Sequence, residues 1–224
     1  NHRPYTIPSD DEQTFHKITV SADSLRQFGF ESNEEMNAFR YTDFGYQKFM
    51  EAASAEKYFP NTIFIFVGDH GIAGNAGKMF PQAWTDERLD NMHVPLLFYA
   101  PSLLRPKRIH EFVSQVDLLP TAAGLARIPY RNTSLGRDLL DSAHTPDKAF
   151  SFLYDPDQGY IGLLMGDYLY REQLTTHKGQ LYPVTSNDPV NPALTGDSLE
   201  KMAGLTRGIY ETSRYLLLNN KKKP

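Results

Sequence analysis

The chain has 224 residues, of which 40% are hydrophobic and 22% charged, and its formal net charge is −4 at pH 7. These values are ordinary for a soluble globular protein, and the length suffices for one large domain or two small ones. Nucleic-acid binding is not expected, because phosphate contacts need clustered Lys and Arg. The absence of cysteine excludes disulfides and thiolate chemistry. No run of about 18 apolar residues predicts a membrane span.

The first half of the chain has the alternation of helix and strand that is typical of α/β proteins. Residues 33–58 predict a helix, because an acidic start is followed by an apolar stripe of helical period. The apolar run at 62–67 predicts a strand covered on both faces, as in a parallel sheet. A glycine-containing loop is expected at 71–92 and a second buried strand at 94–101. The fold class is therefore α/β, with a layered, mostly parallel sheet flanked by helices.

A helix is expected after the second strand, with Asp117 as its N-cap and Pro120 in the first turn. The character of the chain changes after about residue 148. Strand-like runs on both sides of Gly166 predict a hairpin, residues 183–197 predict a loop, and the sequence from Ser198 predicts a terminal amphipathic helix. We expect residues 149–224 to form the antiparallel strands and terminal helix of the same domain as residues 1–148.

Asp69 and His70 follow the strand predicted at 62–67 directly, and glycines lie on both sides of the pair. Ligands collect at the carboxyl ends of strands in open α/β sheets, and a carboxylate beside an imidazole suits Zn²⁺ or Mn²⁺. The pair is therefore a candidate metal site. The alternative is an aspartate that caps a turn beside a surface histidine. Trp84, in the following loop, is either a ligand-stacking residue or an anchor of that loop.

Four motifs, in this order, resemble the sulfatase-like branch of the alkaline phosphatase superfamily. They are "NHRPYTIP", "NTIFIFVGDHG", "HVPLLFYAPSLL" and "SQVDLLPTAAGLA". The chain is most similar to lipoteichoic acid synthase-type proteins, which are phosphoglycerol transferases. The resemblance spans residues 1 to about 140 and implies an alkaline phosphatase-like fold. It also implies that the chain is the C-terminal half of a catalytic domain.

The resemblance assigns roles to individual residues. It implies that Asp69 and His70 ligate a catalytic divalent metal ion, which is Mn²⁺, Zn²⁺, Mg²⁺ or Ca²⁺. It implies that His2 binds the substrate, and it places His93 near the mouth of the active site, where His93 either binds substrate or only packs at the start of a strand. Asp117 is read as a helix cap and not as a catalyst. The family's nucleophile lies upstream of its "NHRP" segment, so no catalytic nucleophile is expected in this chain.

The function that the resemblance implies is metal-dependent transfer or hydrolysis of phosphate or sulfate esters, with transfer of phosphoglycerol or a related head group favoured. A sulfatase or a phosphodiesterase is the alternative within that class. A non-catalytic binding or structural remnant is the alternative outside it. The implied partner is the N-terminal half of the same catalytic domain. The resemblance also implies a parent protein that is anchored in the membrane by upstream helices, with its catalytic domain outside the cytoplasm.

Overall fold

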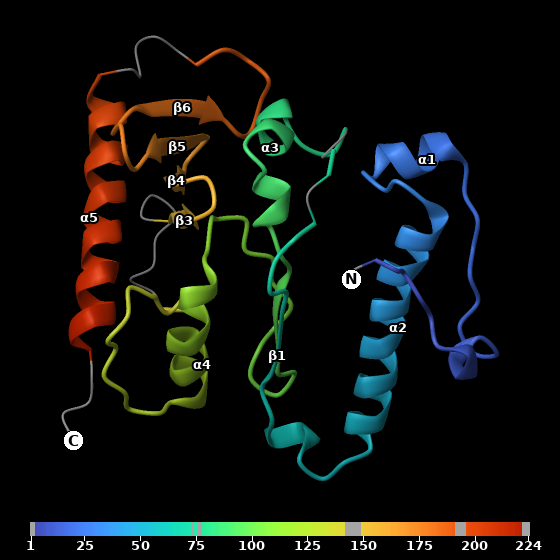
Figure 1. Ribbon diagram of the computed structural model, residues 1–224. Helices are drawn as coiled ribbons and strands as arrows, with labels where there is room; N and C mark the ends of the chain where they lie inside the picture. Colours follow the sequence, from blue (N-terminus) through green and yellow to red (C-terminus); the bar gives the residue numbers. More distant parts are fainter. Residues whose placement is uncertain (1–2, 73, 76–77, 142–148, 191–195, 221–224) are drawn as a thin grey trace. The chain divides into compact units, whose positions relative to one another are not determined.

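The computed structural model describes residues 3–72, 74–75, 78–141, 149–190 and 196–220. The chain divides into two compact units, Asn1–Ser102 and Leu103–Pro224. Both units combine helices with antiparallel strands, so the α/β class is confirmed (Figure 1). The expected division at residue 148 stays a prediction.

The first unit is built on one long helix, α2 (Asn33–Ser54), which follows a short helix, α1 (Ala22–Gln27), and a 3₁₀ turn, η1 (Ser9–Asp11). The side chain of Ser32 caps α2 by accepting a hydrogen bond from the Glu35 backbone at 3.1 Å. The predicted helix is confirmed, although it ends four residues early. A second 3₁₀ turn, η2 (Phe59–Asn61), contains Pro60, which disfavours helical backbone at the residue before it.

Two short strands, β1 (Phe64–Val67) and β2 (Leu96–Tyr99), pair with each other. They run antiparallel, so the expectation of a mostly parallel sheet is wrong for the strands that the structure describes. A parallel pair needs a connection that carries the chain back along the full strand length. Here the connection leaves β1 and enters β2 at the same end of the strand pair. Hydrogen bonds from Gly68 to Pro95 and from Gly71 to Asn91 continue the pairing beyond the strands.

The connection between β1 and β2 is more ordered than the predicted loop. It contains a short helix, α3 (Gln82–Asp86), and a 3₁₀ turn, η3 (Leu89–Asn91). Trp84 and Leu89 are both buried. The ring of Trp84 stacks on Phe80 with their centroids 4.2 Å apart, so Trp84 anchors this segment by packing.

The second unit begins with a 3₁₀ turn, η4 (Gln115–Asp117), which leads into α4 (Leu118–Ala126). Asp117 is the N-cap residue of α4, but its side chain makes no capping bond to that helix. Its buried carboxylate instead accepts from the Ser114 backbone at 2.9 Å and pairs with Arg137, whose Nη2 lies 2.9 Å away. The carboxylate therefore holds the turn to the segment around Arg137. The predicted N-cap position of Asp117 is confirmed, but its side chain does not cap α4.

Four strands form an antiparallel meander in the order β3 (Ser151–Asp155), β4 (Tyr160–Met165), β5 (Tyr168–Gln173) and β6 (Gly179–Pro183). The predicted hairpin at Gly166 is confirmed, and Gly166 takes the positive φ of 57° that a tight hairpin turn needs.

The fourth strand of this meander was not expected, because it begins with glycine and ends with proline. Proline is tolerated there because β6 is the last strand of the sheet and Pro183 is its last residue. Gly179 is required because a Cβ at that position would clash with the ring of Tyr170.

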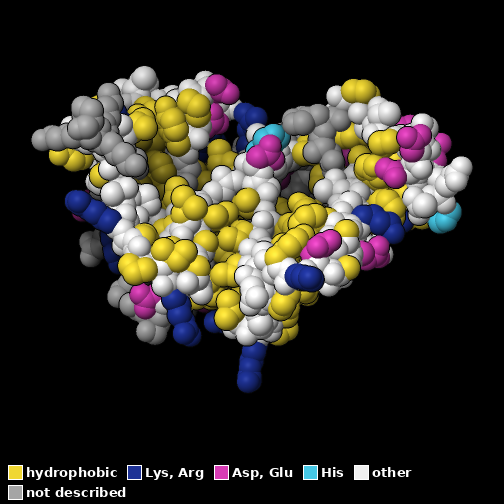
Figure 2. All heavy atoms as spheres, turned by 90° about the horizontal axis from the view of Figure 1, so that it is seen from below, with side chains coloured by type: hydrophobic (Ala, Val, Ile, Leu, Met, Phe, Trp, Pro, Cys, Tyr) yellow, Lys and Arg dark blue, Asp and Glu magenta, His cyan; other side chains and the backbone are white. Residues whose placement is uncertain are grey.

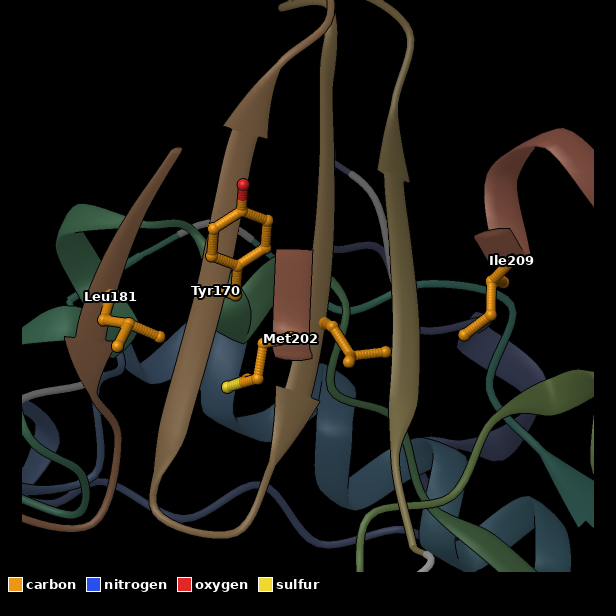
Figure 3. Packing of buried hydrophobic residues seen from close by; sticks show 5 residues of the cluster. Tyr170, Leu181, Met202 and Ile209 are labelled. Atoms are coloured by element: carbon orange, nitrogen blue, oxygen red, sulfur yellow. The ribbon is translucent and has the colours of Figure 1, made fainter. Parts of the chain in front are cut away.

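The predicted terminal helix is α5 (Asp197–Asn219), which lies against the four-stranded sheet (Figure 1). Five buried side chains form the core between the helix and the sheet: Leu163, Tyr170, Leu181, Met202 and Ile209. Figure 3 shows Tyr170 and Leu181 on strands of the sheet and Met202 and Ile209 on the terminal helix. None of the described helices has a stretch that is both long and apolar enough to cross a membrane.

Candidate metal centre

Asp69 and His70 lie just beyond the end of β1, where the apolar strand gives way to glycines. Both side chains are accessible to solvent, with 89% of the Asp69 side chain and 50% of the His70 side chain exposed. The structure therefore places the predicted pair at the surface of the first unit, at the end of a strand, which is where the sequence predicts it.

The imidazole of His70 is oriented by a hydrogen bond to the backbone. Its Nδ1 lies 2.7 Å from the carbonyl oxygen of Gly71. A carbonyl oxygen can only accept, so Nδ1 carries the proton, and in the neutral ring Nε2 carries the lone pair. This is the arrangement in which a metal-ligating histidine is usually held by its surroundings.

The carboxylate of Asp69 contacts both the backbone of the turn and the imidazole of His70. Its Oδ1 accepts from the His70 backbone N–H at 2.9 Å, as expected for an aspartate that caps a turn. Its Oδ2 lies 3.7 Å from Nε2 of His70. The hydrogen bond from the His70 backbone lowers the pKa of Asp69, so the carboxylate is ionised at neutral pH.

The donor set and its spacing fit a shared cation. Metal–ligand distances for carboxylate oxygen and imidazole nitrogen are about 2.0–2.2 Å, so two donor atoms 3.7 Å apart can both reach one ion. The described residues contain no group of three or more His, Asp or Glu side chains that converges on one point. Within the described residues, the candidate centre therefore consists of Asp69 and His70 alone.

Glycines allow the backbone on both sides of this pair to approach the segment that enters β2. A Cβ on Gly68 would lie 2.8 Å from the Cβ of Val94, and one on Gly71 would come closer than 3.0 Å to the carbonyl oxygen of Asp90. Neither approach is possible for a residue with a side chain unless the backbone shifts.

Asp90 is a neighbour of the site that the sequence analysis missed. Its Oδ2 accepts a hydrogen bond from the Gly74 backbone at 2.7 Å. The two residues are 16 positions apart, and neither belongs to a recognisable motif. The one signal that could have indicated such a residue is the glycine-containing loop, whose backbone N–H groups require acceptors.

His93 lies at the entrance to β2 and packs on aromatic rings. Its ring centroid is 5.2 Å from that of Trp84 and 5.7 Å from that of Phe80, both in edge-to-face geometry. Desolvation by this packing lowers the pKa of His93, while part of the side chain stays open to solvent. His2, the other predicted substrate-binding residue, lies outside the described residues.

Comparison with known proteins identifies the family. Residues 1–128 match the sequence profile of the family named Sulfatase. A lipoteichoic acid synthase-like protein of Bacillus subtilis, YvgJ, is 26% identical over 156 residues, which is 65% of this chain and 24% of that protein. Arylsulfatase K of Gallus gallus is 35% identical over 79 residues, which is 35% of this chain and 14% of that protein.

Two solved structures share the fold. A protein of the alkaline phosphatase superfamily from Vibrio parahaemolyticus has a TM-score of 0.63 and 18% identity, over 96% of this chain and 47% of that one. BT1596, a 2-O GAG sulfatase, has a TM-score of 0.54 and 17% identity, over 85% of this chain and 46% of that one. The chain thus spans about a quarter or less of the curated relatives and about half of the solved structures. It belongs to the sulfatase family.

Proposed function

We propose that this chain supplies two metal ligands to an enzyme that transfers or hydrolyses phosphate or sulfate esters, with transfer of phosphoglycerol or a related head group favoured. The observation that carries the proposal is the geometry of Asp69 and His70. An ionised carboxylate and an oriented imidazole present donor atoms 3.7 Å apart at the end of a strand. Membership of the sulfatase family and similarity to a lipoteichoic acid synthase-like protein support the reaction class.

The cation is a divalent metal, and the donor set favours Mn²⁺ or Zn²⁺ over Mg²⁺ and Ca²⁺, which prefer ligands that are all oxygen. When bound, it would polarise the phosphoryl or sulfuryl group and favour the deprotonated nucleophile. Asp69 would contribute negative charge and one oxygen ligand. His70 would contribute Nε2, with its ring held in place through Nδ1 and Gly71.

His93 is proposed to contact the ester group of the substrate. The lowered pKa keeps its imidazole neutral at pH 7, so one ring nitrogen can donate and the other can accept a hydrogen bond. His2 is proposed to bind the same group, and the nucleophile is proposed to lie in the rest of the catalytic domain.

The proposed partner of this chain is that remaining part of the catalytic domain. Among the described strands of the first unit, β1 and β2 pair only with each other, so each has an outer edge open to a further strand. Large apolar side chains on these strands are exposed, including Val67, Leu97 and Tyr99. Figure 2 shows hydrophobic side chains, in yellow, open on the face turned to the viewer. The solved structures with this fold are about twice as long as the match, which supports a missing partner of similar size.

Substitution of Asp69 by alanine in the full protein tests the proposal. Metal content, measured by mass spectrometry, and turnover of aryl phosphate, phosphodiester and aryl sulfate substrates should both fall strongly. Asp157→Ala, which removes an exposed carboxylate from the second unit, should change neither. Full metal occupancy with normal turnover in Asp69→Ala would refute the assignment.

The 224-residue chain alone should turn over none of these substrates. Robust turnover that Asp69→Ala abolishes would place the nucleophile within this chain. A non-catalytic remnant is the second candidate, and it predicts that even the full protein turns over none of the three substrates. The pattern among the substrates distinguishes a sulfatase from a phosphodiesterase or a transferase.

The full protein is proposed to be anchored in the membrane with this portion outside the cytoplasm. The support is the similarity to a lipoteichoic acid synthase-like protein. Protease added to intact cells, or to spheroplasts where there is an outer membrane, should cleave this portion. A portion that is fully protected until the cells are lysed would contradict the proposal.

A further inference from the structure

Three hydrogen bonds tie the Asp69–His70 turn and the loop that follows it to residues 90–95, the segment that enters β2. Gly68 N–H donates to the carbonyl oxygen of Pro95 at 3.1 Å, and Gly71 N–H donates to that of Asn91 at 2.7 Å. The third runs from Gly74 N–H to the Asp90 carboxylate at 2.7 Å. We call these three bonds the clamp. The first two join backbone to backbone, so the third is the one that a side-chain substitution can remove.

Asp90 uses both carboxylate oxygens. Oδ2 accepts from Gly74, and Oδ1 accepts from the backbone of Asn91 at 3.0 Å. The carboxylate therefore joins the loop after His70 to the residue whose carbonyl oxygen receives Gly71. Loss of Asp90 therefore removes one clamp bond and also the contact to Asn91, which accepts the clamp bond of Gly71.

The loop is held close enough to affect His70 itself. The acceptor that fixes the imidazole is the carbonyl oxygen of Gly71, 2.7 Å from Nδ1. The N–H of Gly71 donates to the carbonyl oxygen of Asn91, whose own N–H donates to Oδ1 of Asp90. A shift of Asn91 after loss of Asp90 moves Gly71, and the imidazole loses the contact that directs Nε2.

We propose that Asp90 is a positioning residue that keeps His70 in the orientation and tautomer needed for metal binding. The expected effect of Asp90 on metal binding rests on the proposed function, whereas its expected effect on the His70 ring does not. Asp90 acts through Asn91 and Gly71 and not as a ligand, since the described residues hold no group of three metal-binding side chains.

Four variants of the full protein test this role. Asp90→Ala removes both acceptor oxygens, whereas Asp90→Asn removes the charge and keeps one acceptor oxygen of the two. Gly74→Ala is the matched control, because an added Cβ would lie 3.9 Å or more from its neighbours and the N–H group remains. Asp69→Ala reports loss of a ligand.

The first measurement is Mn²⁺ affinity, followed by electron paramagnetic resonance of the free ion. Asp90→Ala should weaken binding about 10–100-fold, the usual effect of losing a residue that orients a ligand. Gly74→Ala should bind within about threefold of the wild type, because it keeps both hydrogen bonds of Asp90. Asp90→Asn keeps one of them, so its affinity should lie between those of Gly74→Ala and Asp90→Ala. If Asp90→Ala binds Mn²⁺ as tightly as the wild type, the positioning role is wrong.

The second measurement needs no metal. In protein freed of metal by a chelator, at alkaline pH, the ¹⁵N chemical shifts of the His70 ring should report a proton fixed on Nδ1. Asp90→Ala should shift these values toward an average of two tautomers, whereas Gly74→Ala should not. An unchanged His70 ring in Asp90→Ala overturns the proposal. A wild type that binds no Mn²⁺ instead refutes the proposed function, and the ring measurement still decides the role of Asp90.

Discussion

Nε of Arg207 on α5 lies 2.9 Å from both carboxylate oxygens of Glu172 on β5, and only 1% of the Glu172 side chain is exposed. The hydroxyl of Tyr170 donates to the same carboxylate, and Nδ1 of His177 lies 3.3 Å from Oε1. Burial opposes ionisation of Glu172, but these hydrogen bonds outweigh it and lower the pKa. This cluster connects the terminal helix to the sheet.

Glu172→Ala should destabilise the protein by about 2–3 kcal/mol. A buried hydroxyl loses its acceptor and an ion pair is broken, while the 51% exposure of Arg207 lets water recover part of the loss. Urea unfolding of the full protein measures the change. Glu211→Ala is the control on the same helix, because both side chains of the Glu211–Arg214 pair are exposed, and it should cost no more than about 0.5 kcal/mol. Equal effects of the two substitutions would contradict this account.

Tyr170 should make stability depend on alkaline pH. Burial, followed by the hydrogen bond to Glu172, raises the pKa of Tyr170 from 10.0 to about 12. The folded state therefore holds the phenolic proton more tightly than the unfolded state. The contribution of the protonated Tyr170 to the free energy of unfolding is complete below pH 10 and is lost as the pH rises toward 12. The loss should be roughly 2 kcal/mol, at about 1.4 kcal/mol for each pKa unit. Tyr170→Phe should lack this part of the decline, and an identical alkaline profile would refute the prediction.

Gly71→Ala should destabilise the protein by about 1–3 kcal/mol, because its Cβ would press on the carbonyl oxygen of Asp90. Gly204 offers a matched control in an exposed part of α5, where a Cβ meets nothing within 4 Å. Gly204→Ala should stabilise by about 0.5–1 kcal/mol, since alanine is the better helix former. Chemical denaturation measures both, and the two substitutions should change the midpoint in opposite directions.

Protonation of His93 should be visible in the fluorescence of Trp84, the chain's single tryptophan, because their ring centroids are 5.2 Å apart. An imidazolium quenches a neighbouring indole. Burial lowers the pKa of His93, so emission should fall as the pH decreases, with a midpoint below the ordinary 6.5. His93→Gln should give a flat profile over the same range. A midpoint at or above 6.5 would show that the ring is not desolvated.

The sequence predicted the helices and strands with strong periodicity, but not how the strands pair. The apolar run of β1 has the composition of a strand buried in a parallel sheet, and composition is the same for either direction of pairing. The direction depends on the path of the connection, which is set by the burial of Trp84 and Leu89 and by the glycine contacts near the site. These are contacts between distant residues, and local patterns do not encode them.

The position of Asp69 and His70 at a strand end was predictable, whereas the contacts around them were not. Asp69 and His70 stand out because polar groups end an apolar strand between glycines. Asp90 does not stand out, since an aspartate in a polar loop is usually solvated, and only the folded chain brings it to Gly74. The cap predicted at Asp117 illustrates the same limit, because the carboxylate takes a distant partner, Arg137, in preference to the helix beside it.

The order of strands in the second unit has a consequence for the rate of folding. Each strand of the meander pairs with the next one along the chain, through short turns, so its contacts form without closing a long loop. The pairing of β1 with β2 instead encloses the whole connection that holds the candidate metal ligands. Contacts between distant residues slow the rate-limiting step. The sheet from β3 to β6 should therefore acquire protection from hydrogen exchange early in refolding, and the amides of Gly68 and Gly71 should acquire it late.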